Sequence, residues 1–105
     1  MLDAMTPEAR DSYLYARGRR FEKPIPEAPL LIAHEMSLEH QFVEAGGLLL
    51  AGPDPTGNGG VLPGFGDQRE IELLVEAGFS PVEAIRIATL NGAIYEGTQA
   101  SIGSI

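Results

Sequence analysis

The chain has 105 residues, of which 44% are hydrophobic and 21% charged, and its formal net charge is −8. This length suits one small domain or a piece of a larger one, and the composition is that of a globular chain. The longest apolar runs, such as Leu48 to Ala51, are far too short to span a bilayer. The absence of cysteine excludes disulfides, thiolate metal sites and a cysteine nucleophile. Because no secretory signal opens the chain, we expect a cytoplasmic location.

The charge is unevenly distributed along the chain. Residues 1–23 carry five bases and four acids, a net charge of +1, whereas residues 24–105 carry two bases and eleven acids, a net charge of −9. A nucleic-acid-binding surface needs a dense basic stripe, and this chain has only the short run of Arg17, Arg19 and Arg20. We therefore expect neither nucleic acid nor an anionic membrane as a partner.

Two helices are predicted in the first half of the chain. Thr6 as a cap and Pro7 at the first helical position predict a helix from about Pro7 to Arg19. The prolines at positions 24, 26 and 29 exclude a helix over residues 23–29 and predict an extended connection. Helical periodicity returns over residues 32–45 and ends at a Gly-Gly pair. The side chains expected to face inward from this second helix are Met36, Phe42 and Val43.

A strand is predicted directly after the second helix. The run Leu48–Ala51 is fully apolar and precedes a cluster of glycines and prolines, a pattern typical of a strand buried on both faces. Residues 52–66 hold six glycines and three prolines and are predicted to form a loop. A single buried strand cannot satisfy its own backbone hydrogen bonds. Either it pairs with chain outside this sequence or the prediction of a strand is wrong.

Helices are predicted again in the last third of the chain. A capping box, in which a cap residue is followed three positions later by Glu, occurs as Asp67 with Glu70 and as Ser80 with Glu83. These boxes predict one helix that ends at residue 78 and another that begins at residue 81. The second helix is expected to break at residues 89–92, with a short helical turn as far as residue 95. Residues 101–105 alternate in polarity and predict a final strand.

One carboxylate has a position suited to catalysis. Asp54 follows the predicted strand and opens the glycine loop, which is where α/β barrels place catalytic groups. An Asp held there can bind a divalent metal and accept a proton from water. The alternative is that Asp54 is a turn residue between two prolines that caps local amides. His34 and His40 are six residues apart rather than four, so we expect no metal role for them.

Four segments together resemble a known family. Residues 42–54, 63–66, 72–93 and 102–105 resemble the metal-dependent amidohydrolase superfamily, and most closely its imidazolonepropionase-like and prolidase-like branch. The resemblance covers roughly residues 38–105. It implies an α/β fold, in which this chain is the C-terminal portion of a TIM (β/α)₈ barrel, with the last strand and helices, and is largely helical as an isolated fragment. It implies helices before the last strand at 1–46, the last strand, substrate loop and terminal helices at 47–97, and a return strand to a β-sandwich at 98–105.

The resemblance also implies a site. The family's last-strand carboxylate falls on Asp54, which would bind metal and act as general base, although Pro53 stands where the family often has Thr. The loop residues over the substrate would be Thr56, Gly57, Asn58 and Gly59. The family's other metal ligands belong to earlier strands, and one carboxylate cannot hold a catalytic zinc, which needs at least three protein ligands.

We therefore expect a fragment of a hydrolase for carbon–nitrogen bonds in small amides, cyclic amides or peptide-like substrates. It would require a divalent metal, with zinc favoured, and the missing N-terminal barrel portion as its partner. The chain alone is expected to be inactive.

Two other interpretations remain. Residues 76–84, with their Gly78-Phe79 pair, and the later Leu90-Asn91-Gly92 also look like a ubiquitin-associated domain, a helical binding module in which the Gly78-Phe79 loop would contact a partner. The chain could instead be a truncated fragment without a function of its own. In that case its uncovered apolar surface would make it aggregate or oligomerise when expressed alone.

Overall fold

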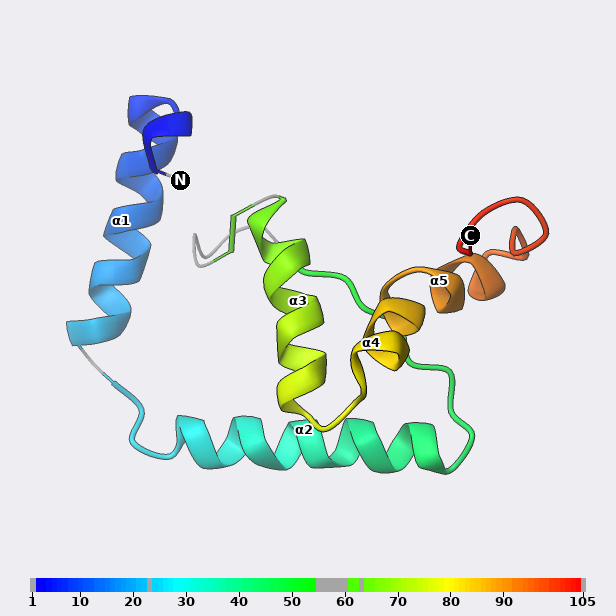
Figure 1. The fold of residues 1–105 in the computed structure, drawn as a ribbon. Helices are drawn as coiled ribbons and strands as arrows, with labels where there is room; N and C mark the ends of the chain where they lie inside the picture. Colours follow the sequence, from blue (N-terminus) through cyan, green and yellow to red (C-terminus); the bar gives the residue numbers. More distant parts are fainter. Residues whose placement is uncertain (1, 23, 55–60, 63, 105) are drawn as a thin grey trace.

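The computed structural model describes residues 2–22, 24–54, 61–62 and 64–104. Its regular structure is helical throughout the described residues (Figure 1). A 3₁₀ turn at Leu2–Ala4 is followed by five helices, α1 Pro7–Glu22, α2 Ala28–Glu44, α3 Phe65–Glu76, α4 Pro81–Ala88 and α5 Leu90–Tyr95. None of the helices in the described segments combines the length and the apolar character needed to traverse a bilayer.

The predicted α/β fold, with the last strand of a TIM barrel, is wrong. The described residues contain no strand, either over 48–54 or over 101–104. A strand exists only when its backbone pairs with a neighbouring strand, and residues 48–54 lie against helices instead. Residues 101–104 form a turn and bends, in which the Ser101 N–H donates to the carbonyl of Thr98 over 3.0 Å. Ile105 lies outside the described residues.

The segment 48–54 nevertheless has two distinct faces. Leu49, Ala51 and Pro53 are half-buried, while the residues between them are exposed. Leu49 and Ala51 pack against the helical core. Burial that alternates with a period of two is what an extended backbone produces. The segment therefore covers the helices with one side and leaves the other side uncovered.

The core lies where α3, α4 and the turn between them meet. Four buried residues form it, namely Leu74, Phe79, Ala84 and Ile87. Partly buried apolar residues from α2, α3 and the 48–54 segment surround this cluster. Such a cluster is small for a chain of this length, since many large apolar side chains elsewhere remain exposed.

The turn between α3 and α4 explains why Phe79 is buried. The N–H of Gly78 donates to the Val75 carbonyl over 3.0 Å, and the N–H of Phe79 donates to the Leu74 carbonyl over 3.2 Å. This is a Schellman motif, and it brings the residue after the glycine onto the last turn of the helix. Gly78 has a φ of 109°, a conformation that side-chain-bearing residues avoid. Phe79 consequently packs with Leu74 in the core.

The helix boundaries confirm some sequence predictions and correct others. The first helix begins at Pro7 as predicted and continues to Glu22. The second begins at Ala28 rather than Ile32, because Pro29 lies in the first turn, where its missing N–H is not needed. Its inward residues include Met36 and Val43, which are half-buried, but Phe42 is exposed on the opposite side.

The two predicted capping boxes differ in outcome. The Ser80–Glu83 box forms, with the Glu83 N–H donating to Ser80 Oγ and the Ser80 N–H donating to Glu83 Oε2. The Asp67–Glu70 box does not, because α3 starts earlier, with Gly64 as its cap and no side-chain cap bond. A Gly that can adopt a φ of 80° allows the chain to enter the helix two residues before Asp67.

The helices do not close into one compact body. Figure 1 shows α1 standing apart from the other helices and α2 running beneath the end of α3. The Cα radius of gyration is 16.1 Å, whereas a compact chain of this length has about 13 Å. Much apolar surface therefore remains open to solvent.

Candidate functional site

Asp54 lies at the end of the segment that packs along the core. It is exposed, on the same face of this segment as Leu48, Leu50 and Gly52. The opposite face, with Leu49 and Ala51, rests on the helical core. The carboxylate therefore lies on the same exposed face of the segment as two leucines that are 39% and 41% exposed.

A buried amide holds this segment in place. The Asn91 side chain, on α5, donates from Nδ2 to the carbonyl oxygen of Leu49 over 2.8 Å. Asn91 is the buried polar residue of the described chain, and this bond satisfies a backbone acceptor that a neighbouring strand would otherwise satisfy. This hydrogen bond joins residues 42 positions apart in sequence and attaches the 48–54 segment to α5.

The described residues do not build a metal site around Asp54. No three His, Asp or Glu side chains in the described ranges come close enough together to hold one metal ion. Catalytic zinc takes three protein ligands, so these residues alone do not fit that group. The predicted substrate-loop residues Thr56, Gly57, Asn58 and Gly59 lie outside the described residues.

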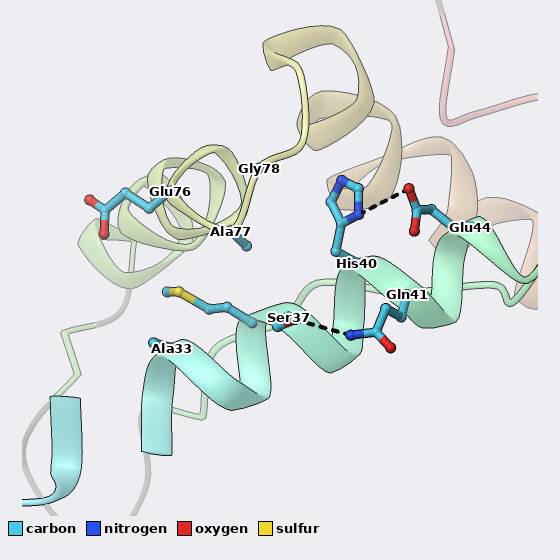
Figure 2. Close-up of a pocket in the computed structure, with 9 residues that line it drawn as sticks. Ala33, Ser37, His40, Gln41, Glu44, Glu76, Ala77 and Gly78 are labelled. Carbon is cyan, nitrogen blue, oxygen red and sulfur yellow. Dashed lines mark hydrogen bonds and ion pairs between the residues drawn. The ribbon is translucent and has the colours of Figure 1, made fainter. Parts of the chain in front are cut away.

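A groove lies between α2 and the end of α3, and Asp54 is not among the residues that line it. It has a volume of about 460 Å³. Figure 2 shows His40 rising from α2 toward the α3–α4 turn. The residues that line this groove are Ala33, Met36, Ser37, His40, Gln41, Glu44, Glu76, Ala77 and Gly78.

The polar groups of the groove are engaged with one another. His40 Nδ1 lies 3.6 Å from Glu44 Oε1, a separation for an ion pair rather than a hydrogen bond. The Ser37 hydroxyl accepts a hydrogen bond from Gln41 Nε2 over 3.0 Å. The His40 ring stacks on Phe79, with 4.9 Å between the ring centroids and an interplanar angle of 28°. His40 therefore joins α2 to the core, and these contacts suit a packing role.

The acid at the far wall of the groove is turned away from the imidazole. Figure 2 shows the Glu76 carboxylate directed away from His40. Arg69 holds it with hydrogen bonds of 2.7 and 3.1 Å, and this guanidinium lowers the pKa of Glu76. Arg69 also bonds to Glu72 at 2.9 Å, which makes a surface network along α3. Glu76 thus does not join His40 across the groove, because its carboxylate is bound to Arg69.

Sequence reasoning missed both anchoring contacts. The stacking of His40 on Phe79 had no local signal, because it joins α2 to a turn far along the sequence. The contact of Asn91 with Leu49 had no local signal, because it joins residues far apart in sequence.

Comparisons with known proteins add no family. No protein-family model matches the chain, and neither the curated proteins nor the solved structures contain a match.

Proposed function

We propose that Asp54 is a catalytic carboxylate of an amidohydrolase-related hydrolase that cleaves carbon–nitrogen bonds in small amides, cyclic amides or peptide-like substrates. The proposal starts from the sequence resemblance over residues 38–105. The observation that carries it furthest is the two-faced segment 48–54, in which Asp54 shares the exposed face with Leu48 and Leu50.

The uncovered face implies that other protein completes the site. Leu48 and Leu50 are 39% and 41% exposed, so covering them would gain part of the roughly 1.5–3 kcal/mol that complete burial of such a side chain contributes. A further part of the protein that covers the whole exposed face of the segment would reach from these leucines to Asp54. That part would supply the remaining metal ligands and the rest of the substrate pocket. Asp54 would supply one metal ligand and the general base.

The role proposed for Asp54 is that of a general base. The carboxylate accepts a proton from the water that attacks the amide carbon, and the proton is then passed to the leaving nitrogen. Zinc, which the resemblance favours, would polarise the amide carbonyl in the completed site. Since the residues that the structure describes do not gather three ligands for zinc, the 105-residue chain should bind the metal weakly and lack turnover by itself.

The test uses the polypeptide encoded by the complete reading frame that contains these residues. Its hydrolysis of a panel of N-acyl amino acids, cyclic imides and dipeptides is followed by release of the amine or the new carboxyl group. Asp54→Asn should lower kcat about 10²–10⁴-fold, the usual contribution of a general base. The matched control is Asp67→Asn, which alters an exposed acid in the first turn of α3. Unchanged turnover in Asp54→Asn, or robust turnover by the 105-residue chain alone, would refute the proposal.

A helical binding module is the second candidate. The packing of α4 against both α3 and α5 and the exposed Gly78 favour it. The burial of Phe79 counts against it, because this side chain was expected to contact the partner. A titration of the isotope-labelled chain with ubiquitin, followed by NMR, distinguishes the two candidates. Shifts centred on Gly78 would support the module, and an unchanged spectrum would eliminate it.

A further inference from the structure

Asn91 is followed directly by Gly92, and this pair has a reactivity that the proposed function does not use. The backbone nitrogen after an asparagine can attack the side-chain carbonyl carbon, Cγ, of that asparagine. Glycine in the second position favours the attack, because it has no Cβ to crowd the nitrogen and the fewest conformational restrictions. An Asn-Gly pair is therefore the sequence at which an asparagine loses its side-chain amide most readily.

The folded chain holds the amide of Asn91 in an unreactive position. Asn91 lies in α5 and is only 8% exposed, and its Nδ2 donates to the Leu49 carbonyl over 2.8 Å. Ring closure between Cγ and the Gly92 nitrogen requires the backbone to leave the helical conformation and the side chain to turn away from Leu49. The reaction therefore needs a local opening in which the contact between Asn91 and Leu49 breaks.

The helix that carries the pair opposes this opening only weakly by itself. The helix α5 has six residues, and Thr89 makes no side-chain cap bond at its start. A helix this short is marginal without tertiary contacts, and a glycine within it lowers its stability further. The N–H of Gly92, at the third position of α5, is one of the first N–H groups, which have no carbonyl partner within the helix. Tertiary contacts, among them the bond to Leu49, therefore keep the pair unreactive.

We propose that Asn91 is a deamidation site that the contact with Leu49 protects, and that its reaction permanently releases the 48–54 segment from α5. In the open state the Gly92 nitrogen gives its proton to water and forms a bond to Cγ of Asn91. The bond between Cγ and Nδ2 breaks, and the amide leaves as ammonia. Water then opens the cyclic imide at one of its two carbonyl carbons, which leaves aspartate or isoaspartate. One water is consumed and one ammonia is released, so the reaction needs no other reagent.

The product of this reaction no longer holds the segment. An ionised carboxylate has no proton to donate, so it would face the Leu49 carbonyl oxygen as a second acceptor in a buried position. Isoaspartate also lengthens the main chain of α5 by one carbon, which disturbs the hydrogen-bond spacing of a helix. The release is therefore irreversible. It does not depend on whether Asp54 is catalytic, so the inference is independent of the proposed function.

The first experiment compares the 105-residue chain in mildly alkaline buffer with the same chain in guanidinium chloride. Peptide mass spectrometry measures the loss of each amide over time, and Asn58-Gly59, the second Asn-Gly pair of the sequence, is the reference in denaturant. In denaturant both pairs should react at similar rates. In buffer Asn91 should react at least about tenfold more slowly than in denaturant, because only the minor open state reacts. Equal rates for Asn91 in the two solvents, or no reaction in denaturant, would overturn the proposal.

Substitutions in the 48–54 segment test whether the contact with Leu49 protects Asn91. Leu49→Ala removes a side chain that packs against the core and should speed the reaction in buffer about tenfold. The matched control Leu48→Ala, on the exposed face, should change the rate by about threefold or less. Gly92→Ala adds a Cβ that meets no neighbour within 4 Å, so it should keep the fold and lose most of the reaction in both solvents. Equal rates in Leu49→Ala and Leu48→Ala would contradict the protection.

The variant Asn91→Asp copies the aspartate product and tests the release. At neutral pH it should unfold at a lower denaturant concentration than the wild type. The difference should shrink at acid pH, where a protonated carboxyl can again donate to the Leu49 carbonyl. If Leu49→Ala does not fold, this variant and the comparison of buffer with denaturant decide. An Asn91→Asp variant as stable as the wild type at neutral pH would overturn the proposed release.

Discussion

Phe79 should be the side chain on which the packed half of the chain depends most. It is only 4% exposed, packs with Leu74 in the core, and stacks on His40 of α2. Phe→Ala changes in cores cost about 3–5 kcal/mol. A packed unit of roughly 50 residues has about 2.5–7.5 kcal/mol of stability in total. Phe79→Ala should therefore remove most or all of the cooperative unfolding transition at room temperature.

A milder change at the same position isolates the contribution of the ring. Phe79→Leu keeps most of the apolar volume and should cost less than about 1.5 kcal/mol. His40→Ala should cost about 0.5–1.5 kcal/mol in the wild-type background, the usual value of an aromatic pair, and much less when residue 79 is Leu. Urea unfolding followed by far-UV circular dichroism measures all three variants as a double-mutant cycle.

The control for this series is Val82→Ala, which truncates a side chain that is 76% exposed on the neighbouring helix α4. Its free energy of unfolding should stay within about 0.5 kcal/mol of that of the wild type. A Phe79→Ala variant that unfolds like Val82→Ala, or a His40→Ala change that costs the same in both backgrounds, would contradict the core and the stacking described above.

Three further predictions concern single contacts. Asn91→Leu should leave the carbonyl of Leu49 without its donor and lower the free energy of unfolding in urea by about 1–3 kcal/mol. A change near zero would show that this bond does not stabilise the fold. The side-chain and backbone hydrogen bonds of Ser80 lower the pKa of Glu83, so its contribution to α4 is present above about pH 4.5 and lost as the pH falls through the lower folded pKa. Helicity in Glu83→Gln should lose that acid-side dependence, and an unchanged pH profile would refute the link. Gly78→Ala forces a φ of 109° on alanine and should cost about 1 kcal/mol or more in thermal unfolding, whereas a neutral result would contradict the turn.

Local signals predicted the helices well where their chemistry was self-contained. The capping box of Ser80 and Glu83 formed as expected, because both partners lie within one helical turn. The equivalent pattern at Asp67 failed, because Gly64 offered an earlier entry into the helix. A capping pattern thus predicts the presence of a helix more reliably than it predicts the residue at which the helix begins.

The error over residues 48–54 has a different origin. Their apolar character and the alternating burial of Leu49 and Ala51 suit a strand, but a strand needs a neighbour, and the described chain places helices and the Asn91 amide there instead. Sequence reasoning anticipated this choice between an outside partner and no strand. It had no means of predicting Asn91, since a contact across 42 residues leaves no local pattern.

The sequence predicted where the candidate carboxylate lies along the chain, but it did not predict which groups surround it. The sequence indicated Asp54 as the acid at the end of an apolar run, and the structure places it on the same exposed face as Leu48 and Leu50. What surrounds a carboxylate in a completed site depends on groups brought from elsewhere, which the pattern of this chain does not encode.

The most direct test of the central claim is a crystal structure of the polypeptide from the complete reading frame, grown with zinc. If Asp54 is a metal-binding catalytic carboxylate, one of its oxygens should lie about 2.0–2.2 Å from the metal, with Leu48 and Leu50 covered by the rest of the protein. A zinc ion held without Asp54, or an Asp54 side chain that still faces bulk solvent in that structure, would contradict the account.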